Sequence, residues 1–321
     1  MVTENLATAS REKIIAARYS IFSNTALTVL KLGVGLITGS VSVLSEAVHS
    51  ASDLMASWIA FFSVRQSDLP ADDKHPYGHG KLESLSGMAE AFLIFGAAFY
   101  IIYEASQKIM HHTTPERLDL GIGVMAISVV TNFYIARYLF RIAKKTDSLA
   151  LEADAEHLRT DVYTSLGVLI GLALARLTGY YLLDPLVAIL VAMMIFHAAW
   201  RLTMAAVETL MDTQLPPSDV EAIKAIFELE PRVLGYHKLR TRKSGSFRYI
   251  DAHILLDDKL SLPQAHDLTE EMEDHIRARF PNTEVTLHTE PYEAENRHLQ
   301  EHHDAATMRG LVDKKNRPPA P

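Results

Sequence analysis

Residues 185–200 of the chain read PLVAILVAMMIFHAAW, a stretch without a single Asp, Glu, Lys or Arg. Residues 120–136 and 162–175 are equally free of these charges. Such uncharged runs are typical of membrane-spanning helices or of the buried helices of a large soluble bundle. In all we count six helix-length apolar segments, at residues 17–38, 41–64, 82–106, 118–142, 154–178 and 183–207. Small residues that suit close packing of membrane helices interrupt them, at Gly33, Gly35, Gly96, Gly123, Gly167 and Gly171.

The average composition combines two regions of different charge. The 321 residues have a formal net charge of −8 and a mean hydropathy of +0.06, which is too apolar for an ordinary soluble enzyme. Residues 1–212 hold 16 Lys or Arg and 20 Asp or Glu, about 17% of that region. Residues 213–321 hold 15 and 19, about 31%. We therefore predict an all-α domain of six transmembrane helices followed by a small soluble domain.

The distribution of positive charge predicts how the helices are oriented in the membrane. Lys and Arg are concentrated before the first apolar segment and in the second-to-third and fourth-to-fifth connections, at Arg11, Lys13, Arg18, Arg65, Lys74, Lys81, Arg141, Lys144 and Lys145. By the positive-inside rule, both termini then lie in the cytoplasm. The first ten residues are polar and lack the apolar core of a cleavable signal peptide. We expect a multi-pass protein of the inner (plasma) membrane.

The soluble part begins at residues 215–217, LPP, which end the last apolar segment. Beyond them the patterns predict the order αββαβ, with a helix, two strands, an amphipathic helix and a strand at 219–229, 233–242, 247–256, 262–280 and 283–288. This order suits a small α+β domain of the ferredoxin-like kind. The expected division is an N-terminal cytoplasmic segment, a membrane domain with one cytoplasmic loop, a cytoplasmic domain and a disordered tail, at 1–16, 17–212 (loop 66–81), 213–292 and 293–321.

The absence of cysteine excludes several classes of protein. A disulfide framework, a cysteine zinc finger, an iron–sulfur cluster and a thiol nucleophile all need Cys. The 15 histidines and the many carboxylates remain available as metal ligands. The mild acidity gives no reason to expect a nucleic-acid partner.

Two apolar segments contain the same motif, His-x-x-x-Asp: His49 with Asp53, and His157 with Asp161. On a helix, residues four apart lie on one face. If the two helices face each other, two imidazoles and two carboxylates converge, which suits a tetrahedral Zn²⁺. Each motif could instead form a local His–Asp hydrogen bond. Ionisable groups inside a membrane are costly and usually functional, which favours the metal site.

These ligand types also suggest a mechanism. Histidine binds metal only when its ring is neutral, so protons and metal compete for the same nitrogens. A site open alternately to two sides of a membrane could exchange metal for protons. Such an antiport needs no ATP, and the sequence contains no G-x-x-x-x-G-K-[ST] loop.

Further candidate ligands lie outside the apolar segments. The connection at residues 70–84, PADDKHPYGHGKLES, contains Asp72, His75 and His79. A polar turn with incidental histidines is the alternative interpretation. The soluble domain has a histidine on each of four predicted elements, with one carboxylate near the last, at His237, His253, His266, His288 and Glu290. Spacing alone does not establish that they converge, and a lone histidine on a strand is more often a surface residue.

Taken together, these motifs resemble the cation diffusion facilitator family, and within it the bacterial YiiP-type (FieF-like) efflux transporters. The resemblance rests on the six segments, the paired His-x-x-x-Asp motifs, the loop motif and the αββαβ domain. The stretches 239–245, LRTRKSG, and 264–266, QAH, also match that branch. It covers roughly residues 10–292.

The resemblance implies a role for each matching residue. It implies a transport site at His49, Asp53, His157 and Asp161, and a loop site at Asp72, His75 and His79. It implies a binuclear cytoplasmic site, in which one ion is held by His237, His266 and Glu290, and the other by His253, His288 and a bridging Glu290. The family is homodimeric, and Lys81 and Asp212 match a pair that interlocks at the membrane surface.

Two positions depart from that branch. The YiiP-type transporters have Asp where this chain has His49, so the expected site is two His and two Asp, as in the vertebrate zinc transporters. Replacing an oxygen ligand by nitrogen favours Zn²⁺ over Mn²⁺. It also disfavours a broad metal selectivity that includes both Cd²⁺ and Fe²⁺. It also adds a second titratable ligand, which affects the number of protons exchanged. Glu290 replaces an Asp, so its longer arm changes the geometry of the cytoplasmic site. His298, His302 and His303 match nothing in the family pattern.

The resulting hypothesis is a homodimeric secondary transporter, not an enzyme. It exports Zn²⁺ from the cytoplasm in exchange for H⁺, within a lipid bilayer and without an organic cofactor or nucleic acid. Zn²⁺ would be both the transported ion and a structural or regulatory ligand of the cytoplasmic domain. The alternatives are a transporter whose main ion is Fe²⁺, Co²⁺ or Cd²⁺, a membrane metal sensor that does not transport, and a soluble helical metallohydrolase.

Overall fold

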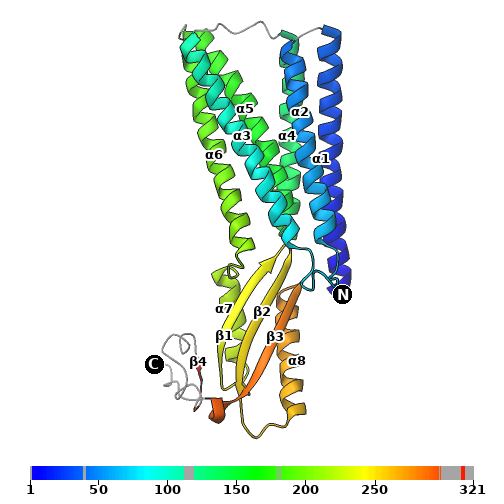
Figure 1. The fold of residues 1–321 in the computed structure, drawn as a ribbon, viewed down its shortest axis with the longest axis vertical. Coiled ribbons are helices and arrows are strands. Elements are labelled where there is room, and N and C mark those ends of the chain that lie inside the picture. The colour runs from blue at the N-terminus through cyan, green and yellow to red at the C-terminus, as the bar shows by residue number, and fades with distance from the viewer. Residues whose placement is uncertain are drawn as a thin grey trace. The chain divides into compact units, whose positions relative to one another are not determined.

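The computed structural model of the protein describes residues 2–38, 41–111, 119–178, 180, 182–295, 297 and 312–314. The chain forms two compact units, one from Thr3 to Leu210 and the other from Met211 onward. The first consists of long helices and the second contains a sheet with helices against it (Figure 1). This confirms the predicted fold class, a helical domain of the transmembrane type followed by a small α+β domain.

The helical unit contains α1 (Val2–Thr38), α2 (Val41–Ser67), α3 (Lys81–His111), α4 (Asp119–Thr146), α5 (Leu149–Thr178) and α6 (Leu183–Leu210). Each corresponds to one of the six apolar segments. Helix α1 departs from the expected boundary, because the segment before residue 17 continues the same helix rather than leading into it. Helix α5 packs against α2, α3, α4 and α6, so its side chains face neighbours on several sides.

Two of these helices are apolar and long enough to cross a membrane by length and composition alone. They are Lys81–Gln107 of α3 and Pro185–Leu210 of α6, among the residues that the structure describes. Large apolar side chains on both point outward, among them Phe92, Phe99 and Met193, each at least 60% exposed. An apolar surface of this kind marks contact with a membrane or another protein. The polar groups inside the apolar segments lower the mean hydropathy of the others.

The sequence predicts close packing of helices at six glycines, and the structure shows it at one of them. A Cβ atom added at Gly167 in α5 would lie 2.7 Å from Cγ2 of Val191 in α6, so this glycine lets two helices approach closely. At Gly33, Gly96 and Gly123 an added Cβ would meet no described atom within 4 Å, so the described part of the chain shows no close packing there. The side-chain surroundings of the other two predicted glycines lie outside the described residues.

The second unit contains α7 (Pro217–Leu229), β1 (Gly235–Ser244), β2 (Phe247–Leu256), α8 (Leu262–Arg279), β3 (Thr283–Pro291) and β4 (Val312–Asp313). The first five elements follow the predicted order αββαβ. The sheet order is β3-β2-β1-β4; β1 is antiparallel to β2 and to β4, and β3 is parallel to β2. Helix α8 makes the crossover that a parallel pair requires. It begins with a capping box between Ser261 and Gln264.

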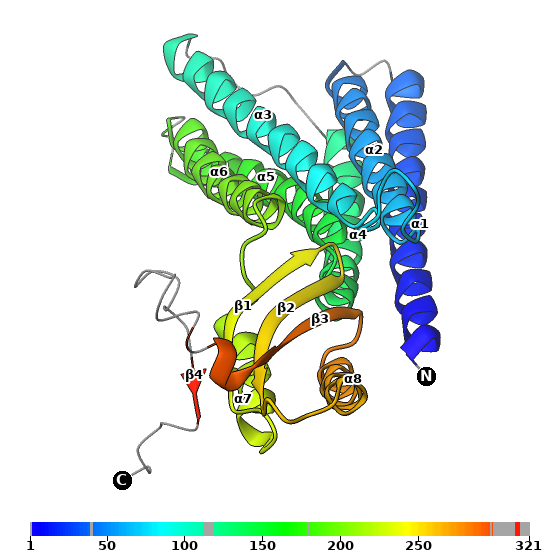
Figure 2. The same cartoon turned by 60° about the horizontal axis from the view of Figure 1, so that its bottom comes forward.

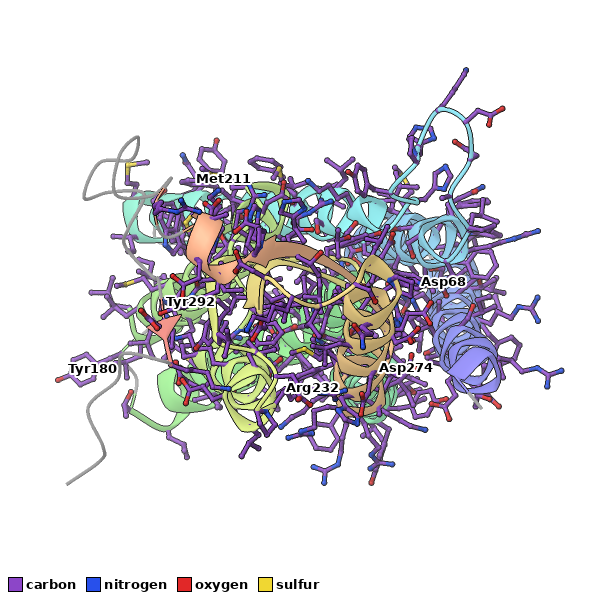
Figure 3. All side chains as sticks on the ribbon, turned by 90° about the horizontal axis from the view of Figure 1, so that it is seen from below. Asp68, Tyr180, Met211, Arg232, Asp274 and Tyr292 are labelled. Atoms are coloured by element: carbon purple, nitrogen blue, oxygen red, sulfur yellow. The ribbon has the colours of Figure 1, made fainter. Side chains whose placement is uncertain are left out.

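Both helices cover one face of this sheet (Figure 2). Their apolar stripes, which include Phe227 of α7 and Met272 of α8, pack on Tyr236, Ile250 and Ile254 of the strands. The next residue along β1, His237, is also buried although it points to the opposite face. Arg232 and Asp274, which are labelled in Figure 3, are exposed at the surface of this unit. The second face of the sheet combines polar groups such as His253 with apolar side chains such as Leu255, which is fully buried but is not part of this core.

The C-terminal tail departs from the expected disorder in two places. Residues 292–295 are helical, and Val312–Asp313 form β4 at the edge of β1. Lys314 donates hydrogen bonds from Nζ to the carbonyl oxygens of Phe227 and Glu230, at 3.2 and 2.7 Å. These carbonyls end α7, where a cation is favoured. A polar segment can thus be ordered by backbone pairing and helix capping without an apolar pattern. His298, His302 and His303 lie outside the described residues.

Candidate metal centres

The two His-x-x-x-Asp motifs meet between α2 and α5. Asp53, His157 and Asp161 each offer a ligand atom, and these three atoms lie within 4.8 Å of one another. His157 Nε2 is 3.2 Å from Asp53 Oδ1. The side chain of His49 lies outside the described residues, although its backbone belongs to α2. The structure therefore brings together three of the four predicted transport ligands.

The chemistry of this cluster suits a bound cation. Asp53 and His157 are 5% and 7% exposed, in the middle of the helical unit. Removing carboxylates from water costs several kcal/mol per ion unless a cation or hydrogen bonds compensate them. One imidazole nitrogen and two carboxylate oxygens are a ligand set that binds Zn²⁺ and neighbouring first-row metals. Because the cluster joins two helices, bound metal can be sensitive to their relative movement.

The loop between α2 and α3 forms a second candidate site at Asp72, His75 and His79, whose ligand atoms also lie within 4.8 Å of one another. The backbone N–H of His75 donates to Asp72 Oδ1 at 2.6 Å, and this hydrogen bond lowers the pKa of Asp72. The His75 and His79 rings lie 4.5 Å apart, and Gly78 adopts the positive φ of +76° that the turn between them needs. The three predicted loop residues converge, on an exposed surface.

A third cluster lies on the face of the C-terminal sheet that the helices leave uncovered. His237 pairs across the strands with His253, and His253 with His288, so three histidines lie side by side on β1, β2 and β3. Glu290, two residues after His288 on the same strand, faces the same side. Its Oε2 is 2.6 Å from His237 Nε2, and its Oε1 is 2.6 Å from His253 Nδ1. A bulge follows His237, where Lys238 has a φ of +49°.

The protonation states of His253 and Glu290 in this cluster suit metal binding. Burial lowers the pKa of His253 below that of a free histidine. Burial acts to raise the pKa of Glu290, but hydrogen bonds with His237 and His253 outweigh it and lower this pKa below its ordinary value. At neutral pH the imidazole of His253 is therefore neutral and the Glu290 carboxylate is ionised, the forms that bind metal.

The structure divides these ligands differently from the expected two sets of three. Glu290 bridges His237 and His253, and His288 Nε2 lies 3.6 Å from Glu290 Oε1. His266 does not join them; it is exposed on α8 and its Nε2 lies 3.5 Å from Glu270 Oε1, one helical turn away. The assignment of His266 to the first ion is not supported, because the helix places it beside its own i+4 neighbour.

The two predicted interlock residues have partners within their own units. Lys81 Nζ donates to the carbonyl oxygen of Leu210 at 3.4 Å, and Arg242 Nη1 donates to Asp212 Oδ1 at 3.4 Å. Their pairing with each other stays a prediction.

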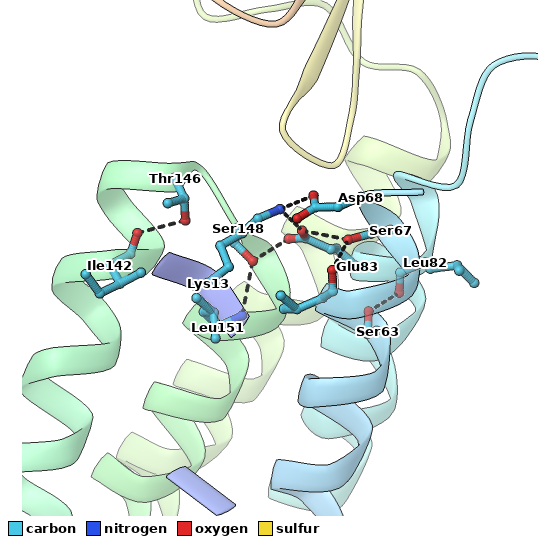
Figure 4. Close-up of polar contacts among 11 residues, drawn as sticks. Lys13, Ser63, Ser67, Asp68, Leu82, Glu83, Ile142, Thr146, Ser148 and Leu151 are labelled. Carbon is cyan, nitrogen blue, oxygen red and sulfur yellow. Dashed lines mark hydrogen bonds and ion pairs between the residues drawn. The ribbon is translucent and has the colours of Figure 1, made fainter. Parts of the chain in front are cut away.

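One buried cluster was not predicted from the sequence. Glu83, fully buried at the start of α3, accepts hydrogen bonds from Lys13 of α1 (3.0 Å), Ser67 of α2 (3.1 Å) and Ser148, which precedes α5 (Figure 4). Lys13 also donates to Asp68. In the sequence Lys13 counts only as one of the positive charges flanking the first apolar segment. The cluster is hard to predict from the sequence, because an ion pair between helices that are far apart in the chain produces no periodic pattern of residues.

Comparisons with known proteins agree with this architecture. Residues 17–211 match the family model of the cation efflux transmembrane domain, and residues 215–292 match that of the cytoplasmic domain of cation efflux proteins. The uncharacterized transporter sll1263 of Synechocystis sp. is 37% identical over 265 residues, 82% of this chain and 86% of that protein. The cation-efflux pump FieF of Shewanella oneidensis is 34% identical over 281 residues, 88% and 95% of the two chains.

Among solved structures, the metal-bound C-terminal domain of the CzcD transporter from Thermotoga maritima is 31% identical and has a TM-score of 0.23. It corresponds to 24% of this chain and 94% of that one. The fold and the family matches define a membrane transporter that moves divalent cations out of a compartment. The chain belongs to the cation diffusion facilitator family and is similar to its FieF branch.

Proposed function

We propose that the protein is a Zn²⁺/H⁺ antiporter that exports zinc from the cytoplasm as a homodimer. The observation that carries the proposal is the buried cluster of Asp53, His157 and Asp161 between α2 and α5. His49, one helical turn before Asp53, is the fourth proposed ligand. Two nitrogens and two oxygens at tetrahedral positions suit Zn²⁺ better than they suit Mn²⁺ or Ca²⁺.

Proton coupling follows from the same ligands. The imidazole of His157 binds either a proton or the metal at Nε2, so release of metal on the side of higher acidity is accompanied by proton uptake. When the helices re-open the site to the cytoplasm, Zn²⁺ displaces the proton. The transport step then uses the proton gradient alone. The proposed site lies between helices, as the binding sites of many secondary transporters do.

The orientation and the assembly belong to the same proposal. The ends at which α2 and α4 stop and α3 starts carry Arg65, Lys144 and Lys81, which supports their placement in the cytoplasm. Both termini then lie in the cytoplasm, and the protein resides in the inner (plasma) membrane. The match to the cytoplasmic-domain model of cation efflux proteins supports a dimer formed through the C-terminal unit. Metal bound by His237, His253 and Glu290 would stabilise that unit and report cytoplasmic zinc.

Metal flux in proteoliposomes tests the function. We expect the purified full-length protein to accumulate Zn²⁺ in vesicles with an imposed pH gradient (acidic inside) and to release protons in return. Fluorescent reporters of metal and of pH, read in parallel, measure both movements. Competition among Zn²⁺, Cd²⁺, Fe²⁺ and Co²⁺ should rank Zn²⁺ first. Metal binding without flux would identify a sensor, and flux independent of the gradient would refute the antiport.

Selectivity should change when the nitrogen ligand at position 49 is exchanged for oxygen. We expect His49→Asp to broaden transport toward Cd²⁺ and Fe²⁺, because the site then offers one imidazole and three carboxylates. The measurement is the ratio of Zn²⁺ to Cd²⁺ uptake rates, with Ser52→Ala on the same helix as the control. An unchanged metal profile would show that His49 does not select the ion.

A further inference from the structure

The strand β4 occupies the free edge of β1 in the second unit. Val312 and Asp313 pair with Tyr236 and Gly235, the first residues of that strand. A Cβ atom added at Gly235 would lie 2.6 Å from the carbonyl oxygen of Val312, so a side chain there would push β4 away. The glycine at the start of β1 therefore allows the C-terminal segment to dock at this edge.

Two further contacts hold residues 312–314 in place. The backbone N–H of Lys314 donates to the carbonyl oxygen of Leu234 at 2.8 Å. The hydroxyl of Tyr292 donates to the carboxylate of Asp313, whose two oxygens lie 2.9 and 3.0 Å away. Tyr292 follows β3 directly and is only 3% exposed. The docked segment thus connects the start of β1 with the end of β3, although β2 lies between the two strands.

The register of the sheet places this contact beside the cytoplasmic cluster, which consists of His237, His253, His288 and Glu290. Across β3, β2, β1 and β4, one row of paired residues is formed by Glu290, Leu255, Gly235 and Asp313. Paired residues point to the same face of a sheet, and the three histidines form the neighbouring row on that face. Asp313 is therefore on the face that carries the cluster, and Tyr292 reaches it there.

Two side-chain bonds cross this face at the same end of the sheet. Glu290 Oε2 lies 2.6 Å from His237 Nε2, which joins β3 to β1. Tyr292, two residues after Glu290, joins the end of β3 to β4 through Asp313. His237 follows Gly235, the partner of Asp313, by two residues. A displacement of β4 therefore changes the separation of the two ligands.

A strand that only protects the edge of the sheet would not need this arrangement. Natural sheets protect an edge with short strands, charges or a covering segment, and backbone pairing is sufficient for that purpose. Here a buried tyrosine also donates its hydroxyl to the edge strand, on the face that carries the ligands. Removing groups that hold metal ligands in place commonly changes metal affinity by about 10- to 100-fold. The bond from Tyr292 to Asp313 is placed to act in this way.

We propose that residues 312–314 form a clip that positions the ligands of the cytoplasmic cluster, with Tyr292 and Asp313 as its positioning residues. Both act through the strands that carry Glu290 and His237 rather than by touching the metal. Docking of the clip and binding of a divalent cation then favour each other to the same extent, because coupling between two sites is reciprocal. The proposal rests on the proposed function in one respect, that the cluster binds metal, and is independent of transport.

Hydrogen exchange of the full-length protein, measured peptide by peptide with mass spectrometry, tests the coupling. Saturating Zn²⁺ should protect the peptides of β2 and β3. It should also slow exchange in the peptide that contains Lys314, whose amide is bonded to Leu234, by about tenfold. The same data give the Zn²⁺ concentration at which the cluster is half occupied, separately from the sites of the helical unit.

Two substitutions remove the bond without changing the ligands. Tyr292→Phe keeps the buried ring and removes the donor, and Asp313→Ala removes the acceptor. Each should raise the Zn²⁺ concentration at half occupancy by about tenfold, whereas Asp313→Asn, which keeps an acceptor, should stay closer to wild type. Tyr249→Phe is the matched control, since Tyr249 is buried on the same face of β2, four residues before His253. The melting temperature without metal reports the folding of each variant.

The outcomes separate the clip from the proposed function. Equal Zn²⁺ midpoints in the wild type, Tyr292→Phe and Asp313→Ala would overturn the clip, even if the variants melted at a lower temperature. Exchange at residues 312–314 that does not respond to Zn²⁺ while β2 and β3 become protected would overturn it too, and neither result contradicts the antiport. If Zn²⁺ protects the clip and the strands but proteoliposomes show no flux, the proposed function fails while the clip stands.

Discussion

The Asp161→Ala variant is expected to lose proton-driven Zn²⁺ flux by at least about a hundredfold while it still inserts into membranes. Asp161 is one of three converging ligands, and its loss leaves His157 and Asp53 with too few donors to hold Zn²⁺ against water. The side chain is intermediate in exposure, so its truncation removes little packing. Flux into proteoliposomes with an acidic interior measures the effect, and membrane yield and melting temperature report folding.

The control for this variant is Glu152→Ala, which removes an exposed carboxylate from the same helix. It should transport at the wild-type rate. His49→Ala should behave like Asp161→Ala, because the proposed site uses both. Normal flux through either His49→Ala or Asp161→Ala would contradict the assignment of the transport site. Equal loss in the Glu152→Ala control would instead indicate a general effect on α5.

The largest effect on stability is expected at Glu83, not at a metal ligand. Glu83→Ala removes the acceptor for Lys13, Ser67 and Ser148 and leaves a buried ammonium group with Asp68 alone. Breaking a buried ion pair from one side costs about 3–5 kcal/mol, because the other charge stays buried and partly uncompensated. We expect a clear fall in the melting temperature of the detergent-solubilised protein.

An exposed pair provides the comparison. Glu12 and Lys145 lie 2.6 Å apart, with the lysine 61% exposed. Glu12→Ala should cost about 1 kcal/mol or less. The double variant Lys13→Met with Glu83→Gln should recover part of the stability, since neither buried charge then remains. If the Glu83→Ala variant has the same melting temperature as the Glu12→Ala variant, the buried cluster does not hold the helix ends together.

The helices of the protein could be predicted because their signal is local. Six apolar segments correspond to six helices, and the spacing of His157 and Asp161 predicts that both lie on one face of α5. The order αββαβ was readable for the same reason, since strands and amphipathic helices differ in period. The ordered strand Val312–Asp313 was missed, because it is held by the backbone of β1 and has no pattern of its own.

The cytoplasmic cluster shows where local signals end. His237, His253 and His288 are each a lone histidine on a strand, and only the register of the sheet places them side by side. The bulge after His237 depends on how β1 pairs with β2, so it has no signal in either strand alone. His266 shows the converse, since it resembled a ligand by its motif but lies beside Glu270 on an exposed face of α8.

By itself, the sequence determined which segments are helices, which residues share a helix face, and that histidine and carboxylate are the available metal ligands. These properties depend on residues a few positions apart, so composition and periodicity contain them. Only the tertiary structure decided that Asp53 meets α5, that Glu83 joins α1 to the start of α5, and that Glu90 and Asp154 are buried. Those contacts depend on how distant helices pack, and burial makes them energetically costly to leave uncompensated.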